Sequence, residues 1–267
     1  MQHASAWSTS ANQTAQIPGL AMGGVLYGLG ALTVYGAVAV AFLVAVCAVC
    51  AIRIDEAVRM CAPLSFEALF SGIDFIRSNK PVILGALSLD LFAVLLGGAT
   101  ALLPVYARDI LHTGPWGLGI LRAAPAAGAL TGSIWLAHFP LRQRAGTALF
   151  GGVIAFGVAT IVFGISHNIY VSLVALAALG ASDVISVIVR MSLVQLQTPD
   201  EMRGRVGAIN SLFIGTSNQL GEFESGMTAG LFGAVPGVLI GGIGTIAVAL
   251  LWMRLFPALR ATKSLEG

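Results

Sequence analysis

The amino-acid sequence predicts an all-α membrane protein with about eight transmembrane helices. Hydrophobic residues make up 57% of the 267 residues, charged residues only 10%, and the mean hydropathy is +0.90. Soluble domains carry about 25% charged residues. This chain therefore has too few charges to cover a water-facing surface, and most of its exterior must contact lipid. The net charge of +2 is too small to indicate a nucleic-acid partner.

Apolar segments of about 20 residues, the length that crosses a bilayer, follow one another along the chain. The first is short and rich in glycine, so it fits either a re-entrant piece or a spanning helix. We count it as spanning because the polar residues before it can extend the helix. The expected spanning helices cover residues 17–32, 34–52, 82–106, 116–137, 146–165, 169–192, 206–231 and 234–256.

Residues 53–81 differ from the rest because they hold several acids and bases. Such a composition fits a plain polar linker, but the apolar residues within it recur at helical spacing. That pattern is typical of an amphipathic helix lying along the membrane surface. The residues that set the spacing are Phe66, Leu69, Phe70, Ile73 and Ile76.

Lysine and arginine residues occur in alternate loops, and this alternation predicts the orientation. The opposite loops hold only Arg108. Because cytoplasmic loops are enriched in Lys and Arg, we expect the basic loops and both termini to be cytoplasmic in a multi-pass protein of the cell (inner) membrane. The basic residues are Arg53, Arg59, Arg77 and Lys80, then Arg142 and Arg144, then Arg203 and Arg205, and finally Arg254, Arg260 and Lys263.

Cysteines give no indication of a metal or redox centre. Cys47 and Cys50 form a C-x-x-C pair inside an apolar run, with no second pair of ligands, so they are interpreted as small packing residues. We expect no disulfide framework, no metal and no cofactor.

Glycines spaced four residues apart predict close contacts between helices, because they let two backbones approach. The repeats are Gly24 with Gly28, Gly128 with Gly132, Gly226 with Gly230, and the triple run Gly233, Gly237 and Gly241.

The stretch TPDEMRGRVGAINSLFIGTSNQLGEFESG, residues 198–226, begins as a short polar turn and continues into an apolar segment with carboxylates and amides. Ionisable groups inside a spanning helix are costly and usually face a cavity or a partner. The alternative for Glu222 and Glu224 is that they lie near the outer mouth of the helix and are simply solvated.

Several motifs of this chain resemble the major facilitator superfamily, in its enterobactin-exporter-like (transmembrane secretion effector) branch. The motifs are PDEMRGRV followed by NSL and LGEFESG, GAVPGVLIGGIGT at the start of the last segment, and SFEALFSGIDFIRSNKPVI before the third. IPGLAMGGVLYGLGA is similar to the Gly/Pro-rich motif of the superfamily's fifth helix, although Leu20 stands in the usual place of a proline. HFPLRQRAG is a degenerate version of its basic loop motif.

The resemblance implies a division of the chain into helices five to twelve of that fold. Residues 1–52 would be the last two helices of the N-terminal half, 53–81 the cytoplasmic linker, 82–258 a complete C-terminal six-helix bundle and 259–267 a cytoplasmic tail. The first four helices would then be absent.

The resemblance also implies a function: small-molecule efflux, driven by an ion gradient in which protons are the expected ion. In this fold the substrate binds between two halves, so we expect no export by this chain alone, and measurable efflux from vesicles that contain only this polypeptide would contradict that expectation. Measurable efflux would imply a homodimer that supplies the second wall. The alternative function is a structural or assembly subunit, or an inactive fragment, that pairs with a chain supplying the missing N-terminal half.

Asp183 is the strongest single candidate for a residue of a substrate or ion pathway, because it lies near the middle of its segment. Ser182, Ser186 and Arg190 form a polar stripe with it. One interpretation is a cavity-facing, protonatable carboxylate; the other is an internal link from Asp183 to Arg190 through Ser186. Asp90, in the third segment, fits either the pathway or a packing hydrogen bond.

In the 206–231 segment, Ser211, Asn218, Glu222 and Ser225 are expected to share a face. Glu224 is a further pathway residue. Arg203 and Arg205 fit either a cytoplasmic gate or simple determinants of topology.

Arg122 is expected about 10 Å deep from the outer side, and Glu222 and Glu224 about 14–16 Å deep. Because the planar guanidinium suits a desolvated carboxylate, we expect an ion pair between Arg122 and one of these acids that closes the outward path in one state and opens in another.

An intramembrane enzyme is the weakest alternative. The sequence contains neither H-E-x-x-H nor a G-x-S-x-G elbow, and no paired nucleophile and base.

Overall fold

The chain is an all-α membrane protein. A computed structural model describes residues 31–51, 81–96, 98–138 and 145–261, and these contain helices and no strand. The elements are α2 (Ala31–Ala51), α4 (Pro81–Leu96), the 3-10 turn η1 (Gly98–Leu102), α5 (Leu103–Val105), the π-helical turn η2 (Tyr106–Ile110), α6 (Gly114–His138), α7 (Ala145–Ile165), α8 (Ile169–Gln197), α9 (Asp200–Phe232), α10 (Ala234–Leu255) and α11 (Pro257–Ala261).

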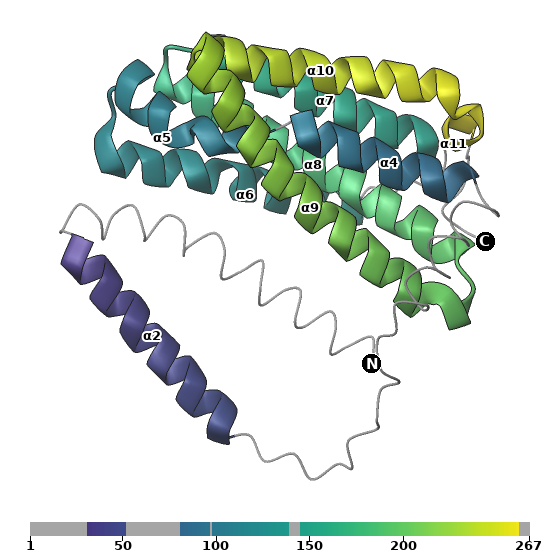
Figure 1. Cartoon of the computed structure of the whole chain (residues 1–267), viewed down its shortest axis with the longest axis horizontal. Coiled ribbons are helices and arrows are strands. Elements are labelled where there is room, and N and C mark those ends of the chain that lie inside the picture. Colours follow the sequence, from purple (N-terminus) through teal and green to yellow (C-terminus); the bar gives the residue numbers. More distant parts are fainter. Residues whose placement is uncertain (1–30, 52–80, 97, 139–144, 262–267) are drawn as a thin grey trace.

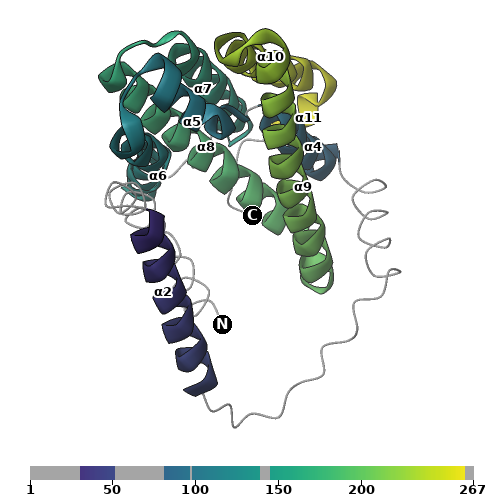
Figure 2. The same cartoon turned by 60° about the vertical axis from the view of Figure 1, so that its left-hand side comes forward.

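The elements from α4 onward form one helical bundle, and α2 lies apart from it (Figures 1 and 2). Within the bundle α6 and α7 both pack on α8, α10 packs on α7, and α9 packs on α4. The side chains of α2 are exposed along its length, and none of its spanning window is buried. The predicted surface helix and nearly all of the first predicted span lie outside the described residues.

Four described helices are long and apolar enough to cross a membrane: α2 from Leu32, α7, α8 and α10. They correspond to the predicted segments 34–52, 146–165, 169–192 and 234–256. Helices α6 and α9, of 25 and 33 residues, are also long enough, but their polar residues lower their hydropathy, and α4 is only 16 residues long.

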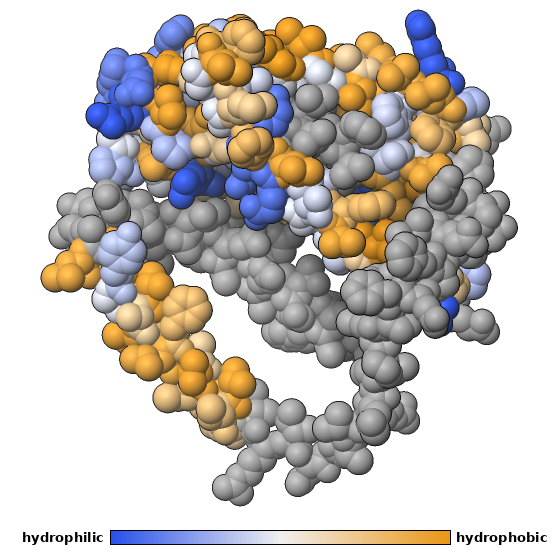
Figure 3. All heavy atoms as spheres, in the orientation of Figure 1, coloured by the Kyte–Doolittle hydropathy of each residue, from blue (hydrophilic) through white to orange (hydrophobic). Residues whose placement is uncertain are grey.

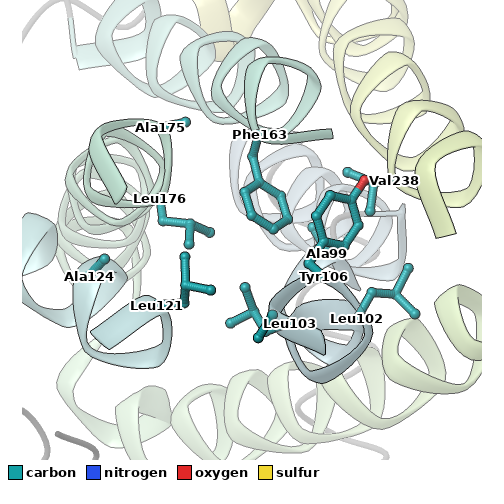
Figure 4. Packing of buried hydrophobic residues seen from close by; sticks show 11 residues of the cluster. Ala99, Leu102, Leu103, Tyr106, Leu121, Ala124, Phe163, Ala175, Leu176 and Val238 are labelled. Carbon is teal, nitrogen blue, oxygen red and sulfur yellow. The ribbon is translucent and has the colours of Figure 1, made fainter. Parts of the chain in front are cut away.

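The segment predicted as one helix over 82–106 is not regular. It passes from α4 through η1 and α5 into η2, so the prediction of a single helix is wrong here. Tyr106 is fully buried, and its hydroxyl donates a hydrogen bond of 2.9 Å to the Gly164 carbonyl oxygen. The centroid of its ring lies 4.5 Å from the centroid of the Phe163 ring (Figure 4). These contacts fix Tyr106 against α7, and the backbone on either side accommodates them with tighter and wider turns.

The polar turn expected at the start of the 198–226 stretch is also wrong. Thr198 and Pro199 alone separate α8 from α9, and α9 begins at Asp200. Asp200 and Glu201 therefore stand in the first helical turn, where acidic residues interact favourably with the helix dipole.

Glycines bring helices of the bundle into backbone contact, for example between α6 and α8 and between α7 and α10. A Cβ atom on Gly128 of α6 would overlap the carbonyl of Ala177 in α8, and one on Gly180 would overlap the carbonyl of Pro125. On the other side of the bundle, a Cβ atom on Gly157 of α7 would lie 2.9 Å from the Gly242 carbonyl oxygen in α10.

The predicted glycine repeats therefore divide into two groups. Gly128, Gly132 and Gly237 lie at helix contacts, as predicted, whereas Gly226 and Gly230 have nothing within 4 Å of an added Cβ atom among the described residues.

Candidate functional site

A buried polar pair joins α8 to α9. Arg190 is 2% exposed and donates a hydrogen bond of 2.7 Å from Nη1 to Oδ1 of Asn210, which is 3% exposed. Val194 and Val206, one helical turn from Arg190 and from Asn210, belong to a buried apolar cluster that also contains Ile83, Leu87 and Ile209. A buried guanidinium needs a hydrogen-bond acceptor such as the Asn210 side chain, because an uncompensated charge at membrane depth is very unfavourable.

The Arg190–Asn210 bond also fixes the register of the two antiparallel helices. Asp183 stands seven residues from Arg190 toward the Ile169 end of α8. Ser217, next to Asn218, stands seven residues from Asn210 toward the Gly233 end of α9. At about 1.5 Å per residue, Asp183 and Asn218 lie at nearly the same level, with Glu222 about 7 Å closer to the Gly233 end. Asp183 occupies the midpoint of α8 and is half-buried.

Helix α9 presents one face to the bundle and leaves the opposite face uncovered. Val206, Ile209, Asn210 and Ser217 are buried, whereas Ser211, Asn218 and Glu222 are exposed. Ser225, seven residues from Asn218 and on the same side of the helix axis, is only 5% exposed. Glu224 is half-buried.

Small residues share the uncovered face of α9 with Asn218 and Glu222. Successive residues of an α-helix are rotated by about 100° around its axis, and by this rotation the residues of the uncovered face fall within an arc of roughly 100°. We call it the α9 open face; it consists of Gly207, Ser211, Gly215, Asn218, Glu222 and Gly226, all exposed.

Arg122 is exposed on α6. In Figure 2, α6 and α9 lie on opposite flanks of the bundle with α8 between them, and Figure 3 shows hydrophilic side chains on the bundle face that these helices border, amid hydrophobic surface. Neither Glu222 nor Glu224 is paired with Arg122 in this structure. The predicted ion pair within one chain is thus not formed in the described state.

The remaining predicted residues are placed as follows. The hydroxyl of Ser186 donates a hydrogen bond of 2.8 Å to the backbone carbonyl of Asp183, and Arg190 donates to Asn210. Arg205 is exposed near the start of α9. The backbones of Asp90 and Arg203 are helical, but their side chains lie outside the described residues.

A bundle of helices with ionisable groups at mid-depth is typical of membrane transporters, and a comparison with known families agrees. The profile of the family described as transmembrane secretion effectors matches residues 3–266. The chain belongs to this family. It is a branch of the major facilitator superfamily, so the predicted all-helical, enterobactin-exporter-like membership is confirmed.

A curated member of the secretion effector branch is similar to this chain. The enterobactin exporter EntS of Citrobacter koseri is 26% identical over 194 residues, which cover 73% of this chain and 46% of that exporter. The chain thus spans about half the length of the curated relative that it matches.

Sequence reasoning did not assign a role to Asn210 in this secretion effector. A usable signal exists, however. Arg190 stands 8 residues before Thr198 and Asn210 stands 11 residues after Pro199. A short turn between antiparallel helices therefore brings them to within about one helical turn of the same level.

Proposed function

We propose that the chain forms one wall of a small-molecule efflux transporter of the inner membrane, driven by an ion gradient, with protons as the coupled ion. The observation that carries the proposal is the half-buried carboxylate of Asp183 at the midpoint of α8, in a helix apolar enough to span the membrane. Such a group is expensive at that depth unless it serves a pathway or meets a partner.

The family supports this proposal. Members share a fold in which substrate sites lie near the bilayer midplane between two helical halves, and the related protein from Citrobacter koseri is named as an exporter. Asp183, Asn218 and Glu222 are the residues that we assign to the pathway, because they lie within about 7 Å of one level.

The test is accumulation of fluorescent and radiolabelled small molecules in bacteria that lack their own exporters and express this chain within a full-length version of the transporter. We expect Asp183→Asn and Glu222→Gln to lower export by at least tenfold. The control is Asp109→Asn, since Asp109 is exposed beside Arg108, 3.6 Å away, outside the bundle interior. Equal export by all variants would overturn the assignment of the pathway.

We propose further that the end of the bundle bearing Pro199 is cytoplasmic, as the Lys and Arg distribution supports. In a cysteine-free chain, a cysteine at Thr113 should react with an impermeant thiol reagent in intact cells, and one at Gln143 should not. The reverse labelling would overturn the orientation.

A further inference from the structure

Glu224 stands on the packed face of α9, whereas Glu222 stands on the α9 open face. Glu224 follows Val206 by eighteen residues, or about five full helical turns, so both side chains leave the helix in the same direction. Val206 is buried in the cluster that α9 shares with α4, and Ser217, seven residues before Glu224, is fully buried. The half-buried Glu224 carboxylate is therefore directed into the bundle.

The element opposite Glu224 is the 3-10 turn η1, which packs on α9. Helices α4 and α9 run in the same direction, and Leu87 and Ile209 belong to one buried cluster. From that contact outward, the rise is about 1.5 Å per residue in an α-helix and about 2.0 Å in a 3-10 helix. Leu102, the last residue of η1, then lies within about 3 Å of the level of Glu224.

The Glu224 carboxylate forms neither a hydrogen bond nor an ion pair with the residues that the structure describes. The hydroxyls of Ser217 and Thr228, on the same face of α9, each donate to a backbone carbonyl oxygen of α9 itself. Since a hydroxyl has one proton to donate, neither serves the carboxylate. A buried carboxylate without donors is far more costly than the neutral carboxylic acid.

No base on the described elements packed against this face lies at the level of Glu224. Neither η1 nor α5 contains a titratable residue. In η2, the Tyr106 hydroxyl donates to a carbonyl of α7, and Arg108 and Asp109 are exposed beside each other. The other titratable residues are separated from Glu224 along the bundle by about 10 Å (Asp183 of α8), about 18 Å (Asp90 of α4 and Arg254 of α10) and about 21 Å (Arg190 of α8).

The backbone of η1 suits a movable contact. It belongs to the stretch that changes from α-helix to 3-10 helix, back to α-helix and then to π-helix, and such irregular turns often mark hinges. The side chains of Ala99, Leu102 and Leu103 point into the cluster around Tyr106 and Phe163 (Figure 4). The contact of η1 with α9 can therefore open while these apolar side chains stay packed on their own cluster.

We propose that Glu224 is the proton-binding residue that controls the contact between η1 and α9. With its proton, the side chain is a neutral carboxylic acid and η1 packs on α9. When the proton passes to water, the carboxylate needs hydration, and η1 moves away from α9 to admit it. One proton is bound or released, and no other bond forms or breaks. The use of this switch in export rests on the proposed function, in which protons drive transport.

The experiment measures the contact between η1 and α9 directly and needs no substrate. Spin labels are attached to cysteines placed at Thr100 of η1 and Met227 of α9, both exposed, in an otherwise cysteine-free full chain in lipid nanodiscs. Pulsed EPR measures the distance between the labels from about pH 4 to about pH 9, which covers the titration of protein carboxyl groups. The ratio of long-distance to short-distance populations should rise at least about tenfold with pH.

Variants of Glu224 separate its carboxyl group from its packing. E224Q is neutral at every pH and close in size to the protonated acid, so it should keep the short distance throughout. E224M repeats the test with an apolar side chain of similar length, and E224D should retain the pH response. D109N alters an exposed acid of η2 and should behave like the unsubstituted chain. A short distance in E224Q would also show that this variant folds.

Three results would overturn the proposal. The first is an unsubstituted chain whose label distance does not respond to pH. The second is a pH response that persists in E224Q and E224M. The third is a response that is lost in E222Q and kept in E224Q, which would assign the switch to the α9 open face. Failure of the proposed function is a separate outcome, because it appears as equal export by the pathway variants and leaves this distance unchanged.

Discussion

The α7–α10 contact and the α9 open face are both rich in glycine, yet they have opposite surroundings. Gly157 and Gly242 pack backbone to backbone, with an added Cβ atom on Gly242 lying 3.0 Å from the Gly157 carbonyl oxygen. Gly207, Gly215 and Gly226 meet nothing within 4 Å. Glycine therefore occurs both where two helices of the bundle pack closely and where a helix face is left uncovered.

The packed and the open face of α9 can be compared most directly through asparagine, because Asn210 lies on the first face and Asn218 on the second. Asn210→Leu removes the acceptor of the buried Arg190 guanidinium and should lower the free energy of unfolding by about 3 kcal/mol. Asn218→Leu, two turns away on the open face, should change it by less than about 0.5 kcal/mol. The measurement is unfolding of the bundle in lipid bicelles by steric trapping. Similar losses for both variants would mean that the two faces of α9 are equally packed.

Glycine substitutions test the same contrast with a smaller expected effect. Gly128→Ala forces a methyl group into the Ala177 carbonyl, so α6 and α8 must separate, and we expect a loss of about 2 kcal/mol. Gly215→Ala adds the same methyl group where there is open space, and it should be neutral or slightly stabilising through helix propensity. A loss in the second variant, measured on one copy in isolation, would break the comparison.

Two serine-to-alanine variants, one inside the bundle and one on the α9 open face, have the smallest expected effect on stability. The indole nitrogen of Trp252 in α10 donates a hydrogen bond of 2.9 Å to the hydroxyl of Ser88 in α4. Ser88→Ala should therefore cost about 1 kcal/mol, whereas Ser211→Ala on the α9 open face should have no measurable effect. Thermal unfolding in detergent, followed by circular dichroism, is sufficient to rank these two variants.

The helices of this fold could be predicted because a span of about 20 apolar residues is a strong local signal. The irregular stretch after α4 could not, since Tyr106 determines the backbone there through contacts with Phe163 and Gly164 on another helix. The start of α9 was missed because charged residues suggested a loop, although acids suit a first helical turn.

For the candidate site, the sequence identified the depth of Asp183 but not the partner of Arg190. Nor could it tell which glycine repeats are packed, because Gly128 with Gly132 and Gly226 with Gly230 have the same spacing and only tertiary contacts separate them. The functional roles of Asp183, Asn218 and Glu222 remain predictions.

The polarity of α9 bears on how the chain enters the membrane during synthesis. Near a helix centre, a charged residue opposes release from the translocon into lipid by about 2.5–3.5 kcal/mol, and α9 carries Glu222 and Glu224. The preceding helix, α8, is apolar enough to insert by itself and brings Arg190, the partner of Asn210. With only two residues between them, we expect α8 and α9 to enter the bilayer together as one helical hairpin.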